Sequence, residues 1–179
     1  LLLGCQSIDV QLRQLDPSTA SMKIIRDGEV WLSKHSINSH PKVYADIYRL
    51  VAEARFAESK KQHTVSAYQS YQRRYETSES VSDLVSKAHQ LEAQRYFDTQ
   101  VTADPSAMKH REFQSLYPSS KLIAQSKEAE VRLALADAVS QDTPEAYGDF
   151  LKRYEDQPIA AQSVLKARTK YEKAYYLQV

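Results

Sequence analysis

The chain has 179 residues with 24 basic and 23 acidic side chains, and no apolar run approaches the ~20 residues that a bilayer-spanning helix needs. This near-neutral balance shows no basic excess or stripe, which argues against a nucleic-acid binder. Three glycines stand against twelve tyrosines. Since tight turns and phosphate-cradling loops depend on glycine, the composition favours helices joined by short polar links.

The N-terminal residues read LLLGCQ. This motif resembles the lipobox of bacterial lipoprotein precursors, in which apolar residues and a small residue precede an invariant cysteine. The resemblance implies that residues 1–4 are the remnant of a signal peptide, and that Cys5 becomes the acylated N-terminus. Two or three acyl chains anchor a protein stably where one is marginal. Gln6, in place of the aspartate that retains lipoproteins in the inner membrane, implies export to the outer membrane. Cys5 is the only cysteine, so we expect no disulfide.

The segment after the cysteine is polar, and we expect residues 5–19 to form an extended lipidated tether. Residues 20–35 leave two interpretations open. The Asp27-Gly28 pair lies between apolar runs, which predicts a small β-hairpin. The alternative is a helix broken near Gly28. A loop follows over residues 36–41.

From residue 41 onward, apolar side chains recur at three- and four-residue spacing, as on one face of an amphipathic helix. We expect a long helix first, and then shorter and longer helices in alternation. Their predicted starts carry proline or an N-capping residue, because proline suits the first helical position. These start signals are Pro41, Thr64, Asp104-Pro105, Pro118, Thr143-Pro144 and Pro158.

An internal repeat is the strongest signal in the sequence. Residues 64–76 read TVSAYQSYQRRYE and residues 143–155 read TPEAYGDFLKRYE, and the match continues into the next helix. A weaker copy lies between them, where Phe113 and Tyr117 fall on Tyr71 and Tyr75. Each unit is a short helix followed by a longer one. Because one helix pair cannot bury its apolar face alone, we expect stacked antiparallel pairs and a single all-α domain over residues 20–179.

The phrases AYGDFLKRY (146–154) and EFQSLYPSSK (112–121) resemble the tetratricopeptide-type repeats of bacterial envelope proteins, such as the outer-membrane lipoprotein BamD and the periplasmic protein CpoB. The resemblance covers roughly residues 64–179. Only residues 117–120 keep the full Tyr-Pro-x-Ser phrase of that family. The resemblance implies an α-solenoid scaffold whose concave surface holds a segment of a partner protein.

Few residues carry a chemical signal beyond the repeat. His35 and His40 match no zinc-ligand spacing, and no serine lies in a nucleophile-elbow context, so we expect no metal, no cofactor and no enzymatic activity. Tyrosine, tryptophan and arginine are enriched in protein-binding surfaces. The candidate partner-binding residues are Trp31, Arg73, Arg74, Tyr96, Lys152, Arg153 and Tyr176.

These features predict a lipid-anchored adaptor on the outer membrane, facing the periplasm, that binds other envelope proteins. The alternative is a structural subunit that self-assembles within an envelope-spanning machine for secretion or motility. A third hypothesis is a binder of peptidoglycan or small ligands, which would require a deep polar pocket.

Overall fold

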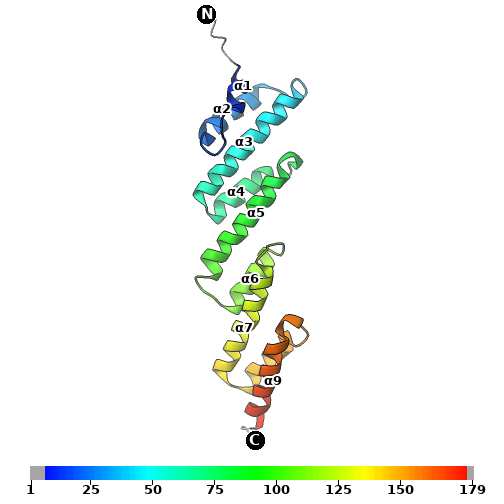
Figure 1. Ribbon diagram of the computed structural model, residues 1–179. Coiled ribbons are helices and arrows are strands. Elements are labelled where there is room, and N and C mark those ends of the chain that lie inside the picture. Colours follow the sequence, from blue (N-terminus) through cyan, green and yellow to red (C-terminus); the bar gives the residue numbers. More distant parts are fainter. Residues whose placement is uncertain (1–6, 177–179) are drawn as a thin grey trace, which may run out of the picture. The chain divides into compact units, whose positions relative to one another are not determined.

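The computed structural model describes residues 7–176 (Figure 1). Within this range every regular element is helical and no strand occurs, which confirms the all-α prediction. The signal-peptide remnant and Cys5 lie outside the described residues. Among the described helices, none combines the length and apolar character needed to cross a bilayer.

The helices follow one another with short connections, and helices adjacent in sequence pack together. A 3₁₀ turn (η1 or η3) leads into α5 and α9, and a π-helical turn (η2) extends α5. The bounds are α1 Ile8–Arg13, α2 Ser21–Lys34, α3 Pro41–Gln62, α4 Val65–Tyr75, η1 Glu79–Val81, α5 Ser82–Tyr96, η2 Phe97–Val101, α6 Ala107–Leu116, α7 Ile123–Gln141, α8 Pro144–Tyr154, η3 Pro158–Ala160 and α9 Ala161–Tyr176.

The chain divides into two compact units between Arg95 and Tyr96. The sequence predicts one domain over residues 20–179, whereas here each unit has a core of its own. In the first unit, α1, α2 and α3 enclose one apolar cluster, and α3, α4 and α5 enclose a second. In the second unit, α7, α8, η3 and α9 enclose the main cluster.

The predicted extended tether is wrong for residues 8–13, which form helix α1. The reason is the side chain of Leu12, which is 2% exposed and packs in one cluster with Ile24 and Ile47. Burying one leucine stabilises a fold by about 1.5–3 kcal/mol, so this short helix gains its stability from packing rather than from its length.

The β-hairpin predicted around Asp27-Gly28 is also wrong, because both residues lie inside α2. The Asp27 carboxylate accepts hydrogen bonds from Lys23 and Arg26 within the same helix. Gly28 faces α3, and a Cβ atom there would lie less than 3.0 Å from Cγ2 of Val51. This glycine therefore serves the close approach of two helices and not a turn.

Three successive elements of the first unit recur in the second, 79 residues later. Helices α4 and α8 begin at residues 65 and 144 and end at 75 and 154, so both differences are 79. The 3₁₀ turns begin at 79 and 158, and helices α5 and α9 begin at 82 and 161, again 79 apart. The same spacing holds for the threonine caps, since Thr64 accepts from the Ala67 amide and Thr143 from the Ala146 amide.

The connections that enter α4 and α8 share an unusual backbone. His63 and Asp142 both adopt a left-handed conformation with φ of 48° and end the preceding helix. Histidine and aspartate tolerate this region better than most residues other than glycine. Each is held by a tyrosine hydroxyl of the next helix, in the pairs His63–Tyr68 at 2.8 Å and Asp142–Tyr147 at 2.7 Å.

Candidate binding grooves

An open groove of about 590 Å³ lies in the first unit between α2, α3 and α4. We call it the N-terminal groove. Its walls combine the apolar side chains of α2 with polar and charged side chains of α3 and α4. The lining residues are Met22, Ile25, Arg55, Glu58, Ser59, Gln62, Ser66, Ala67, Ser70, Tyr71 and Arg74.

A smaller groove of about 210 Å³ lies in the second unit between α6, α7 and α8. We call it the C-terminal groove. It has the same order of elements, with a long helix followed by a short one. The lining residues are Ala107, Arg111, Ala134, Asp137, Ala138, Gln141, Ala146, Asp149, Phe150, Arg153 and Tyr154.

The two linings correspond residue by residue at the 79-residue spacing. An acidic side chain, a glutamine and an arginine occupy the same places in both grooves, and the aromatic floor is Tyr71 in one and Phe150 in the other. The corresponding pairs are Arg55/Ala134, Glu58/Asp137, Ser59/Ala138, Gln62/Gln141, Ala67/Ala146, Ser70/Asp149, Tyr71/Phe150 and Arg74/Arg153.

The arginine that the grooves share has different partners in the two units. In the N-terminal groove, Nη2 of Arg74 lies 2.7 Å from Oε1 of Glu29, and the same oxygen accepts from Arg55 at 2.5 Å. A carboxylate of α2 thus neutralises both guanidinium groups. In the C-terminal groove, the guanidinium of Arg153 has no ion-pair or hydrogen-bond partner among residues 7–176. Arg153 is therefore available to a carboxylate from outside the chain.

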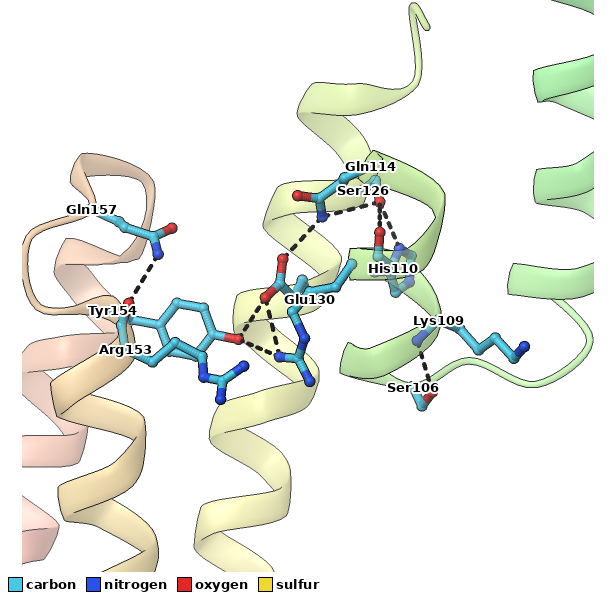
Figure 2. A network of polar contacts seen from close by, with 10 residues as sticks. Ser106, Lys109, His110, Gln114, Ser126, Glu130, Arg153, Tyr154 and Gln157 are labelled. Atoms are coloured by element: carbon cyan, nitrogen blue, oxygen red, sulfur yellow. Dashed lines mark hydrogen bonds and ion pairs between the residues drawn. The ribbon is translucent and has the colours of Figure 1, made fainter. Parts of the chain in front are cut away.

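A buried polar network lies beside the C-terminal groove and joins α6, α7 and α8 (Figure 2). The carboxylate of Glu130 is 7% exposed and accepts from the Tyr154 hydroxyl at 2.7 Å and from the Gln114 amide at 2.9 Å. Arg111 donates to the same Glu130 oxygen as Tyr154, at 3.3 Å. Burial, followed by the hydrogen bond to Glu130, raises the pKa of Tyr154 to about 12. Because every partner is a donor, Glu130 stays charged and ties three helices together.

His110 lies in the same network on α6 (Figure 2). Its Nδ1 atom is 3.1 Å from the hydroxyl of Ser126, which is fully buried. Burial lowers the pKa of this imidazole, and the neighbouring Glu130 charge opposes that shift. The neutral ring therefore bridges α6 and α7, and it gives this seam a dependence on acid pH.

The first unit has a similar clamp. Glu92 on α5 is 5% exposed and accepts from the amides of Gln69 and Gln72 on α4 at 2.9 and 2.6 Å. The positions 79 residues after Gln69 and Glu92 are Gly148 and Tyr171. A Cβ on Gly148 would lie 3.7 Å from the Tyr171 ring, so an apolar contact replaces the polar clamp there.

The predicted partner-binding residues fall into different surroundings. Arg74 and Arg153 line the two grooves, whereas their chain neighbours Arg73 and Lys152 are exposed and lie outside both linings. Trp31 is 8% exposed and stacks on His35 at 4.1 Å, so it belongs to the first core and is not an open anchor.

The two tyrosines proposed from the sequence also differ. Tyr96 is half-buried and packs on Phe113 and Tyr117, with ring centroids 6.4 and 5.3 Å away. Tyr176 is 78% exposed. Burial is the main cause that raises the pKa of Tyr96, which agrees with its position in a packed seam. Only Tyr176 of this pair presents its ring to solvent.

Sequence reasoning missed the acidic and amide residues of the grooves. Glu58 and Asp137, like Gln62 and Gln141, lie at the ends of α3 and α7, one turn before the repeated segment begins. The signal that could have found them is the same 79-residue spacing, extended backwards into the preceding helix. Glu130 carried no such signal, because the connection before α7 differs in length.

Among residues 7–176, no three histidine, cysteine or carboxylate side chains converge in a way that could hold a metal ion. No family model matches the sequence, and comparisons with curated proteins and with solved structures likewise found no match.

Proposed function

We propose that this protein is a lipid-anchored adaptor of the bacterial envelope, which binds partner proteins through its two helical grooves and catalyses no reaction. The observation that carries the proposal is the correspondence of the two groove linings at a spacing of 79 residues. A surface that recurs with its acid, amide and arginine in place fits repeated recognition of extended or helical segments.

The proposed architecture is a short array of tetratricopeptide-like helix pairs. The paired helices α4–α5 and α8–α9 support it, because their bounds, threonine caps and 3₁₀ turns recur at one spacing. The middle pair, α6–α7, supports it less closely, since its connection is shorter. In such arrays neighbouring pairs complete each other's core, and the grooves between them become binding surfaces.

The proposed anchor is Cys5, acylated on the outer membrane with the helical body facing the periplasm. The LLLGCQ motif supports it. Metabolic labelling with an alkyne-tagged fatty acid tests this point directly. The wild-type protein should carry the label and partition with outer-membrane vesicles, and Cys5→Ala should lose both properties. A labelled Cys5→Ala protein would contradict the anchor.

Charge reversal tests the grooves, because the chain offers matched neighbours. Arg153→Glu changes a groove residue, and Lys152→Glu makes the same charge change one residue away, outside the lining. Arg74→Glu and Arg73→Glu form the equivalent pair in the N-terminal groove. The full-length lipidated variants would be captured from detergent-solubilised envelope, and bound proteins quantified by mass spectrometry.

A partner recognised in the C-terminal groove should be depleted about tenfold or more by Arg153→Glu and retained by Lys152→Glu, as expected for loss of a desolvated charge pair. Equal recovery with both variants would contradict binding in that groove. Because Arg74 already pairs with Glu29, its variant also needs a check of the fold, for which helical circular dichroism suffices.

A further inference from the structure

An aromatic pair ends helix α9 with its rings largely in solvent. Tyr175 is 53% exposed and Tyr176 is 78% exposed, and their ring centroids lie 6.2 Å apart. Leu165, three turns earlier on the same side of the helix as Tyr176, is 65% exposed. Exposed aromatic side chains grouped in this way are typical of sites where a partner docks.

The chain contains a second pair at the same place in its repeating pattern, and that pair is covered. Tyr96 and Phe97 precede Tyr175 and Tyr176 by 79 residues. Phe97 is 8% exposed and packs edge-on against Phe113 of α6, with ring centroids 5.0 Å apart.

Helix α6 contributes further groups to this contact. The ring of Tyr117, just after α6, lies 5.3 Å from that of Tyr96, and the Tyr96 hydroxyl forms a hydrogen bond with Glu112. Phe113 and Tyr117 are four residues apart, so they lie on one side of the helical segment. The covering helix thus supplies two aromatic rings and a carboxylate directly before the first of them.

We propose that the Tyr175–Tyr176 pair is a docking site for a helix of a partner protein that carries a carboxylate followed by an aromatic residue, and a second aromatic residue four positions later. The retained tyrosine is part of the argument. Tyr175 keeps the hydroxyl that Tyr96 uses to bind Glu112, so the site keeps both the aromatic contact and the hydrogen bond that select such a helix.

A second copy of this chain does not fit the site as well as a partner does. Phe113 and Tyr117, which would offer the right pattern, are 0% and 4% exposed. Among residues 7–176, the large aromatic side chains exposed to solvent are Tyr175 and Tyr176 themselves. The inference uses neither groove, so it stands or falls separately from the proposed function.

The experiment uses a helix-stapled peptide with the sequence of residues 104–122 as a probe, added to the isotope-labelled full-length protein and followed by nuclear magnetic resonance. Chemical-shift changes should be confined to α9 around Tyr175 and Tyr176. Either Tyr175→Ala or Tyr176→Ala should weaken peptide binding about tenfold or more. Leu165→Phe serves as a control that keeps the pair intact and adds apolar surface.

The matched control peptide carries Phe113→Ala and Tyr117→Ala and should cause no shift. Equal shifts with both peptides would overturn the proposal, as would shifts confined to Tyr96 and Phe97, which would mean that the peptide replaces α6 in its own place. Sedimentation of the protein alone adds a third outcome. A dimer that Tyr176→Ala dissociates would identify a second copy as the occupant, and would also overturn the proposal.

Discussion

Replacement of Gly28 by alanine tests the helix packing of the first unit most sharply. The new Cβ would collide with Cγ2 of Val51 on α3, at less than 3.0 Å. Overfilling a packed seam costs about 1–3 kcal/mol, because the helices must separate or a side chain must leave its rotamer. Alanine in a helix interior returns about 1 kcal/mol relative to glycine. We therefore expect a net loss of about 1 kcal/mol.

The control is Gly148→Ala on α8, where the added Cβ would lie 3.7 Å from Tyr171, an ordinary contact. Here the helix preference acts alone, and we expect a gain of about 0.5–1 kcal/mol. Urea unfolding followed by circular dichroism gives the signs, and amide hydrogen exchange assigns each change to its own unit. A stabilising Gly28→Ala, equal to that of Gly148→Ala, would refute the close approach of α2 and α3.

Three further predictions concern buried polar groups. The Tyr71 hydroxyl has no hydrogen-bond partner among the described residues, and burial raises its pKa, so Tyr71→Phe, which copies the equivalent Phe150, should raise the free energy of unfolding by about 1 kcal/mol in urea titrations and reduce the loss of stability above pH ~10. Burial lowers the pKa of His110 below 6.5, so its contribution is present above that pH and is lost as the pH falls through the depressed value; unfolding measured across this range should therefore become less pH-dependent in His110→Gln. Glu130→Ala should cost about 2–4 kcal/mol, discounted for the partly exposed Arg111, because it strands the Tyr154 hydroxyl and the Arg111 charge; a loss under 1 kcal/mol would show that the network contributes little.

Much of the helical pattern was predictable because its signals are local. Thr64 and Thr143 cap their helices as their sequence context indicates, and Pro144 occupies the first turn of α8. The prediction at Asp27-Gly28 was wrong because a dipeptide that favours turns also permits two helices to touch. Only the position of Val51, a residue of another helix, decides between these uses.

The surface was less predictable than the fold. Arg74 and Arg153 were selected from the sequence as binding residues, and they do occupy equivalent places in the two grooves. Trp31 was selected for its residue type alone and is buried in the first core. The Glu130 network could not be anticipated, since a buried carboxylate and a solvated one look alike until their helix neighbours are known.

Site-specific photocrosslinking in intact cells tests most directly the claim that the grooves hold a partner. A photoreactive amino acid would replace Ser70 or Asp149, which line the two grooves, and in control proteins Arg73 or Lys152, which do not. The account predicts that a crosslinked partner of defined mass forms from the groove positions, and is absent or much weaker from the controls. Crosslinks of equal yield from all four positions, or only crosslinks between copies of this chain, would contradict it.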